Sequence, residues 1–279
     1  MQILISGSDM IKTAANIIKG VFRSKKHIKS NFQKIGWVRE KLIKHQDDKT
    51  IKKIQFQHVS ILYKRPYELL HSYKEIFEQE IYRFSTKSDN PLIIDCGSNI
   101  GLSVIYFKNL YPGAHIIAFE PDETNFEILN LNIQNNGLTN IELHKSAVWI
   151  TNGEISFEAK ESEASHISDN TSDFKVSSIR LRNIIDSYQK VDFLKLDIEG
   201  AEYQVMRDIE NILSKVENLF LEYHGKVEEA YKLNEILTFL NNCGFSIYIK
   251  NAADNLQKPF VEKRTGTIYD VQLNLFCYK

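Results

Sequence analysis

The feature that most constrains the fold of this chain is the segment from Ile93 to Gly101, where an apolar run ends in an acid and two glycines four residues apart. An amphipathic stretch, Leu102 to Leu110, follows directly. The pattern predicts a buried strand, a tight turn and a helix, because glycine permits a sharp turn and the close approach of a ligand. In an open parallel sheet, ligands bind outside the carboxyl ends of the strands, so the segment predicts a binding site as well as a fold.

Apolar runs and helical patterns alternate from Leu92 onward. Strands are expected at 92–96, 115–120, 141–148, 191–197 and 217–223, with helices at 101–110, 123–135, 179–187, 201–213 and 227–242. Residues 153–158 alternate like a short strand, and the Ser-rich stretch 159–175 reads as a loop. Strict alternation predicts an α/β fold with a doubly wound, mostly parallel sheet. No helix separates the last two strands, 245–250 and 271–278, so one of them should run antiparallel at the sheet edge.

The first part of the chain differs in charge and pattern. Residues 1–60 hold thirteen Lys and Arg against four Asp and Glu, and apolar residues between Ile17 and Ile43 follow helical spacing. We therefore expect residues 1–85 to form a basic helical extension and residues 86–279 to form the main domain. The cationic face of the extension is either a solvated surface or a surface that meets an anionic partner, such as a phosphate-bearing glycan carrier or a membrane face.

Composition excludes several classes of protein. The net charge of −1 gives no overall attraction to nucleic acid, and no apolar run approaches the length that spans a bilayer. The three cysteines have no metal-binding spacing, and the N-terminus has no cationic, apolar signal sequence. We expect a cytoplasmic protein with reduced thiols.

The glycine spacing selects the cofactor class. A dinucleotide fingerprint needs glycine at positions 99 and 102, where this chain has Asn99 and Leu102, so a nicotinamide cofactor does not fit. What remains is an acid-x-Gly-x-x-x-Gly pattern, typical of S-adenosylmethionine (SAM) sites. We expect the turn to bind SAM through Asp95, Gly97, Ser98, Asn99 and Gly101.

A second acid supports the same cofactor. Glu120, followed by Pro121, ends the next strand, where a carboxylate can accept two hydrogen bonds from a ribose diol. Ser146 and Ala147 are expected to present backbone to the adenine, on which Trp149 could also stack.

These motifs together resemble the FkbM family of SAM-dependent methyltransferases. The resemblance covers about residues 90–250 and is most specific in Lys195-Leu196-Asp197-Ile198-Glu199-Gly200-Ala201-Glu202 and in Glu222-Tyr223-His224. It implies a Rossmann-like class I methyltransferase domain with a seven-stranded sheet, over residues 86–279. It also implies methyl transfer to hydroxyl oxygens of polyketides, sugars or glycolipids. Ser98 stands where family members often have Ala.

Methyl transfer to an unactivated hydroxyl needs orientation and a route for the alcohol proton. We expect a catalytic group of Lys195, Asp197, Glu222 and His224 at neighbouring strand ends, with His224 as base because imidazole titrates near neutral pH. Alternatively, Asp197, Glu222 and His224 hold a divalent ion such as Mg²⁺ or Mn²⁺, which would acidify the bound hydroxyl. Asp197 could also bind SAM. His166 and Tyr269, both in predicted loops, are weaker candidates for substrate contact.

The function that fits these residues best is SAM-dependent O-methylation of a hydroxyl, with a sugar of a glycan or glycolipid as the expected acceptor. Two alternatives remain open at this stage. One is a small-molecule, polyketide-type O-methyltransferase, and the other is a SAM-binding scaffold without turnover.

Overall fold

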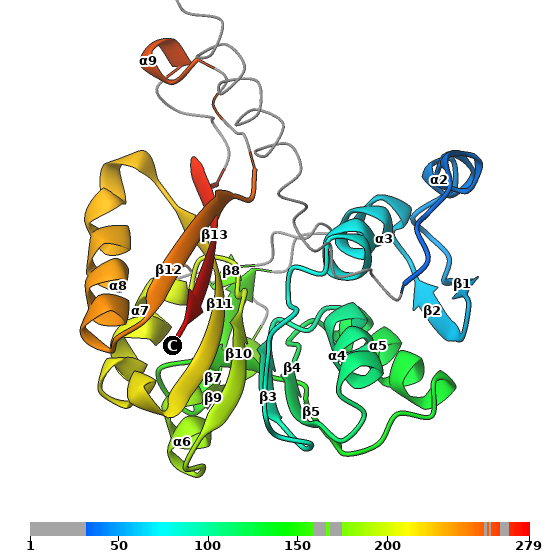
Figure 1. The fold of residues 1–279 in the computed structure, drawn as a ribbon. Helices are drawn as coiled ribbons and strands as arrows, with labels where there is room; N and C mark the ends of the chain where they lie inside the picture. Colours follow the sequence, from blue (N-terminus) through cyan, green and yellow to red (C-terminus); the bar gives the residue numbers. More distant parts are fainter. Residues whose placement is uncertain (1–31, 159–165, 168–174, 254–255, 257, 263–267) are drawn as a thin grey trace, which may run out of the picture. The chain divides into compact units, whose positions relative to one another are not determined.

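Seven strands form the central sheet, in the order β12-β13-β11-β10-β3-β4-β5 (Figure 1). Neighbouring strands are parallel from β11 through to β5, whereas β13 is antiparallel to both of its neighbours. The strands are β3 (Leu92–Cys96), β4 (His115–Phe119), β5 (Ile141–His144), β10 (Val191–Leu196), β11 (Val216–Gly225), β12 (Ser246–Asn251) and β13 (Val271–Tyr278). The predicted α/β fold with a doubly wound, mostly parallel seven-stranded sheet is therefore confirmed. The antiparallel strand lies inside the sheet, however, and β12 forms the edge.

The computed structural model describes residues 32–158, 166–167, 175–253, 256, 258–262 and 268–279. The basic run Arg23 to Lys29 lies outside the described residues, so its predicted partner stays untested. Gln33–Lys279 form one compact unit. Among the described helices, none combines the length and hydropathy that crossing a bilayer requires.

One face of the sheet packs against α6 (Leu181–Asp186), α7 (Glu202–Ile209) and α8 (Ala230–Asn242), seen beside β11 in Figure 1. Fully buried residues from these helices, such as Leu181, Met206 and Leu240, join strand residues in one apolar cluster. Shorter helices connect or extend them: η2 (Glu210–Lys215), η3 (Val227–Glu229) and α9 (Pro259–Glu262). The near-continuous apolar runs of β3 and β10 follow from this arrangement, because parallel strands at the centre of a sheet are buried on both faces.

The other side carries α4 (Leu102–Leu110) and α5 (Glu123–Asn135). Asp122 caps α5 by accepting the backbone N–H of Asn125 at 2.8 Å, and the helix ends before Gly137, which has a positive φ of 60°. Seven consecutive residues of α4, Leu102 to Lys108, are buried, so this helix is covered on its outer side as well. The cover comes from residues 33–85.

Residues 33–85 contain α2 (Trp37–Lys44), β1 (Lys52–Phe56), β2 (Val59–Tyr63), α3 (Pro66–Tyr73) and the π-helical turn η1 (Lys74–Glu78). Phe77 packs edge-on against Tyr106, and Tyr82 packs against Phe107. The expectation of a wholly helical extension is wrong for residues 52–63, which form the antiparallel hairpin β1–β2. A domain boundary at residues 85 and 86 stays a prediction.

A second, four-stranded sheet, in the order β6-β9-β7-β8, lies beside the main one. Its strands are β6 (Ala147–Trp149), β7 (Gly153–Glu158), β8 (His166–Ile167) and β9 (Lys175–Arg180). The predicted strand 141–148 is therefore split between two sheets, and the predicted helix 179–187 begins at Leu181 after β9. Only the backbone of His166 is described, so its candidate role stays open.

Candidate functional site

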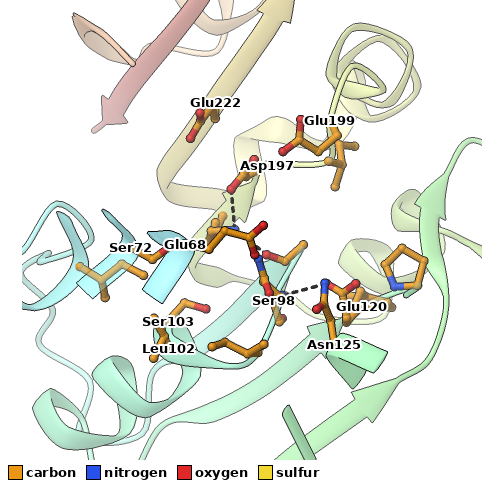
Figure 2. A pocket seen from close by; sticks show the side chains of 18 of the residues that line it. Glu68, Ser72, Ser98, Leu102, Ser103, Glu120, Asn125, Asp197, Glu199 and Glu222 are labelled. Carbon is orange, nitrogen blue, oxygen red and sulfur yellow. Dashed lines mark hydrogen bonds and ion pairs between the residues drawn. The ribbon is translucent and has the colours of Figure 1, made fainter. Parts of the chain in front are cut away.

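A cavity of about 180 Å³ opens at the carboxyl ends of β3, β4 and β10 and is roofed by α3 and η1 (Figure 2). The cavity has two parts: Glu120 and Asn125 lie in one, and Glu199 and Glu222 lie in the other. Its lining includes ten of the residues that the sequence nominates: Gly97, Ser98, Asn99, Glu120, Pro121, Ser146, Ala147, Lys195, Asp197 and Glu222. The lining leaves out three others, which are Asp95, Gly101 and His224.

The glycine turn after β3 forms part of the cavity floor. Gly97 and Gly101 have φ values of 82° and 87°, a region that side chains disfavour. A Cβ atom at Gly97 would overlap the carbonyl oxygen of Asp197, and one at Gly101 would meet the side chain of Leu129 at 2.5 Å. The two glycines are therefore needed both for the backbone path and for close packing. Gly101 packs against Leu129 on α5 and does not line the cavity.

Lys195 fixes this turn from the neighbouring strand. Its side chain is 3% exposed, and its ammonium donates to the carbonyl oxygen of Gly97 at 2.8 Å and to Asp197 at 3.2 Å. Asp95 lies 3.6 Å away and accepts a hydrogen bond from Ser103 at 2.5 Å. Burial alone lowers the pKa of Lys195, but the carboxylates of Asp197 and Asp95 outweigh it and hold the pKa well above its ordinary value. The buried lysine is therefore a cation that holds the ends of β3 and β10 together.

Glu120 occupies the position expected of a ribose acceptor. Its two carboxylate oxygens accept the backbone N–H groups of Asn99 at 2.8 Å and Asp122 at 2.9 Å. The side chain lines the cavity although the residue is only 5% exposed. Burial raises the pKa of Glu120 to about 7, against the effect of the two backbone donors. Ser146 and Ala147 also line the cavity, whereas Trp149 packs against the core and is absent from the lining.

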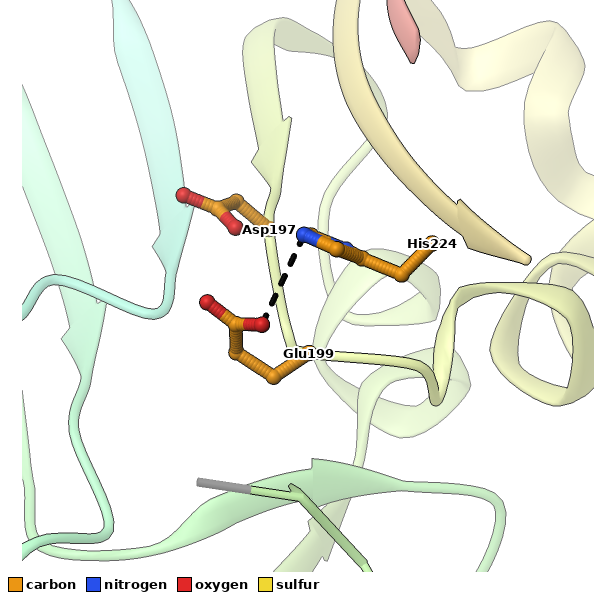
Figure 3. Close-up of side chains that lie close together, drawn as sticks. All are labelled: Asp197, Glu199 and His224. Carbon is orange, nitrogen blue, oxygen red and sulfur yellow. Dashed lines mark ion pairs between the residues drawn. The ribbon is translucent and has the colours of Figure 1, made fainter. Parts of the chain in front are cut away.

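An acidic cluster lies at the ends of β10 and β11. Asp197, Glu199 and His224 offer ligand atoms that all lie within 4.8 Å of one another (Figure 3). The Nε2 atom of His224 lies 3.5 Å from Glu199 and 3.7 Å from Glu222, while its Nδ1 atom contacts Glu202 at 3.1 Å. The group of possible metal ligands that lie together in the structure thus contains Glu199, where the sequence predicts Glu222.

The carboxylates around His224 set its charge. Burial lowers its pKa, but Glu202, Glu199 and Glu222 together outweigh burial and raise the pKa to about 10. Burial also raises the pKa of Glu199 to about 9 and that of Glu222 to about 8. His224 is therefore an imidazolium enclosed by acids, with a side chain that is 1% exposed.

Glu202 has a structural task in this cluster. It accepts the backbone N–H groups of Ile198 at 3.2 Å and Gly200 at 3.0 Å, and so closes the turn after β10. Tyr269 supports the same turn by donating its hydroxyl to the carbonyl oxygen of Glu199 at 2.5 Å. The turn presents Glu199 to the cavity, at a positive φ of 54°.

The roof of the cavity was missed by sequence reasoning. It consists of residues before β3: Lys64, Arg65, Glu68, Leu69, His71, Ser72, Glu75 and Ile76. Arg65 pairs with Glu68 at 2.6 Å and donates to Asn125 at 3.3 Å, so this end of the roof lies over the Glu120 half. At the other end, η1 is a π-helical turn, a feature frequent at functional sites. The signal available in the sequence was Arg65-Pro66, a helix start that places Glu68 in the first turn.

Comparison with known proteins decides the family. The model of the methyltransferase FkbM domain matches residues 95–247, which is more than half of the chain. This chain belongs to the FkbM methyltransferase family. It is therefore a SAM-dependent methyltransferase, and the matched range begins at Asp95 and includes both the glycine turn and the acidic cluster.

Curated relatives of this FkbM methyltransferase differ in what their names describe. "Methyltransferase 1" of Beauveria bassiana is 26% identical over 190 residues, covering 58% of this chain and 76% of the relative. "Hexuronic acid methyltransferase AglP" of Haloferax volcanii is 27% identical over 157 residues, covering 54% of this chain and 64% of the relative. A solved FkbM methyltransferase from Methylobacillus flagellatus is 20% identical with a TM-score of 0.48, covering 71% of this chain and 46% of that one. The chain thus spans less than half of that solved protein.

Proposed function

We propose that this protein transfers the methyl group of SAM to a hydroxyl oxygen of a sugar, as part of the cytoplasmic modification of a glycan or glycolipid. The observation that carries the proposal is the single cavity that joins the glycine turn and Glu120 to the carboxylates of Glu75, Asp197 and Glu222. A methyl donor and an acceptor need adjoining places, and carboxylates are good partners for the hydroxyls of a sugar. A relative named for a hexuronic acid supports a sugar acceptor.

In this proposal the cofactor lies along the glycine turn. Glu120 accepts hydrogen bonds from the ribose diol, and the segment Ser146–Val148 borders the adenine. Ser98, Asn99 and Pro121 border the ribose and the methionine part. Asp95 does not reach the cofactor and instead positions Ser103 and Lys195, which it contacts and which line the cavity.

The chemical step is an in-line displacement. The acceptor oxygen forms a bond to the methyl carbon while the carbon–sulfur bond breaks, and its electron pair stays on sulfur as S-adenosylhomocysteine (SAH) forms. The alcohol proton must pass to a group that reaches the cavity. Glu222 lines the cavity and His224 does not, so we assign proton acceptance to the ionised form of Glu222, which is populated as the pH rises through its raised pKa of about 8, and give His224 the task of holding it.

A divalent ion is a second candidate for the same cluster, because Asp197, Glu199 and His224 converge within 4.8 Å. An ion there would replace the proton on His224 and lower the pKa of a bound hydroxyl. The buried contact between His224 and Glu202 resembles the outer carboxylate that orients many metal-binding histidines.

The decisive experiment measures acceptor-dependent formation of SAH with a panel of free glycosides. Activity on any sugar hydroxyl supports the proposal, and Glu222→Gln should lower kcat roughly 10²–10⁴-fold without changing the affinity for SAH. Glu142→Gln, an exposed acid on the edge strand β5, is the matched control. Turnover only on acceptors without a sugar would contradict the sugar assignment.

A further inference from the structure

The acceptor end of the cavity is lined and backed by acidic side chains. Four carboxylates line it, those of Glu75, Asp197, Glu199 and Glu222, and two more, Asp95 and Glu202, lie directly behind them. The two buried cations among these acids are Lys195 and His224.

Neither cation is free to receive an anion. Lys195 is in contact with the carbonyl oxygen of Gly97 at 2.8 Å, with Asp197 at 3.2 Å and with Asp95 at 3.6 Å. Three carboxylates surround His224 at 3.1 to 3.7 Å, and its side chain does not reach the cavity surface. Six acidic groups thus share two cations that are already engaged. Burial and the neighbouring acids already raise the pKa of Glu199 and of Glu222, so a further negative charge is unfavourable there.

The remaining basic groups of the lining do not change this balance. Arg65 is paired with Glu68 and contacts Asn125, and Lys64 precedes it at the same end of the roof. His71 lies 3.5 Å from Glu75, so a proton on its imidazole would be matched by that carboxylate. Among the described residues that line the acceptor end, each basic group therefore has a carboxylate partner, and Lys250, outside the lining, interacts with Glu75.

Tyr82 provides a second observation at the same end of the cavity. The residue is 4% exposed, lines the cavity and stands on an apolar floor made by Phe107, Phe193 and Phe220. Among the hydrogen bonds of the described residues, none involves its hydroxyl, while the ammonium of Lys195 lies 5.9 Å from its ring centre. Because Tyr82 lines the cavity, its hydroxyl is available to a bound molecule.

We infer that the part of the acceptor that enters the cavity carries no negative charge, and that it is a neutral sugar or an amino sugar held by Glu75, Glu222 and Tyr82. This inference rests on the proposed function and specifies its substrate class. Carboxylates accept hydrogen bonds from neutral hydroxyls and from ammonium groups but repel a carboxylate or a phosphate, whereas the phenol of Tyr82 can donate to or accept from a sugar hydroxyl. The acceptor thus differs in charge from the acid named for the Haloferax relative. A phosphate of a lipid carrier would have to stay outside the cavity.

The test compares matched acceptors that differ in one group: methyl glucoside, the corresponding 2-amino glucoside and the corresponding glucuronide, with the galacto and manno series beside them. With saturating SAM, we expect kcat/KM for the uronates to be lower than for their neutral and amino partners by roughly tenfold to a hundredfold. A uronate that reacts as well as its neutral partner overturns the inference and leaves the proposed function standing. If SAH binds but no sugar is methylated, the proposed function fails, and the inference fails with it.

Two variants locate the effect. Glu75→Gln should reduce the discrimination against uronates while the affinity for SAH stays constant, and Glu127→Gln, exposed on α5, should leave the discrimination unchanged. Tyr82→Phe should raise KM for the preferred sugar. The control Tyr106→Phe removes a hydroxyl from a buried tyrosine outside the lining and should leave that KM unchanged. Equal KM values for Tyr82→Phe and the parent protein would remove Tyr82 from the acceptor site.

Discussion

The side-chain amide of Asn132 is hydrogen-bonded to both backbone groups of Leu62, accepting its N–H at 2.6 Å and donating to its carbonyl oxygen at 2.9 Å. The same amide donates to the carbonyl oxygen of Ile100 in the glycine turn at 2.8 Å. One fully buried side chain on α5 thus connects the hairpin that leads into the roof with the turn that forms the cavity floor.

Replacing Asn132 with Ala should therefore destabilise the protein by roughly 3 kcal/mol, because three partly buried backbone groups lose their partner. Urea denaturation followed by circular dichroism measures the change. Asn135→Ala, at an exposed position of the same helix, should change the free energy of unfolding by less than about 0.5 kcal/mol. Equal effects of the two substitutions would contradict this role of Asn132.

Gly97→Ala should abolish SAH binding. Its methyl group would overlap the carbonyl oxygen of Asp197, in a backbone conformation that disfavours side chains. Gly137→Ala has the same backbone problem, with a φ of 60°, but its methyl group would meet no atom within 4 Å. That control should lose only roughly 1–2 kcal/mol of stability and keep its affinity for SAH, as judged by calorimetry.

The affinity for SAH should fall as the pH falls through 7. The pKa of Glu120 is raised to about 7 by burial, so below that pH a proton must leave before the carboxylate can accept the ribose hydroxyls. Linkage then predicts a dissociation constant about tenfold higher at pH 6 than at pH 8. Glu120→Gln should bind SAH more weakly and without this pH dependence, so a slope that survives the substitution would point to a different ionisable group.

Lys195→Met should be strongly destabilising, since it removes one partner of a buried ion pair and leaves Asp95 and Asp197 uncompensated. The loss expected is about 3–5 kcal/mol. Lys190→Met, just before the same strand, removes an exposed partner of Asp192 and should change the stability by about 1 kcal/mol or less. If both variants unfold at the same urea concentration, Lys195 does not hold the two strand ends together.

Exhaustive treatment with EDTA should leave the methyltransferase active, because in our proposal Glu222 accepts the alcohol proton directly. Atomic absorption on the purified protein and activity after dialysis measure this. Loss of activity that Mg²⁺ or Mn²⁺ restores, together with loss of that rescue in Glu199→Gln, would instead support the ion bound by Asp197, Glu199 and His224.

The sequence predicted those helices and strands whose hydrophobic pattern extends over the full length of the element. The strand Leu92–Cys96 and the helix Glu123–Asn135 were both predicted with their observed bounds, because burial on both faces and a capped, periodic helix leave clear signals. The hairpin β1–β2 was missed. Its turn places Gln57 at a φ of 50°, without the Asn-Gly or Asp-Gly pair that usually marks a two-residue turn.

The floor of the site was predictable and the roof was not. Glu120, Lys195 and Asp197 directly follow or belong to strands, and the strand order brings them together. Glu75 reaches the same cavity through a π-helical turn, whose extra residue shifts the helix face in a way that periodicity does not reveal. The exclusion of His224 from the lining depends on a rotamer packed among three carboxylates, which spacing alone could not specify.

The roof residues Lys64 to Ile76 are contiguous in sequence and precede every strand of the central sheet. A short part of the gene thus contributes Glu75 to the acceptor's surroundings, apart from the strand ends that contribute Glu120, Lys195 and Glu222. Recombination or mutation within that short stretch can alter which compounds are modified while the chemistry of transfer is inherited intact. A chimera that exchanges this stretch between two relatives is thus a direct route to new acceptor ranges.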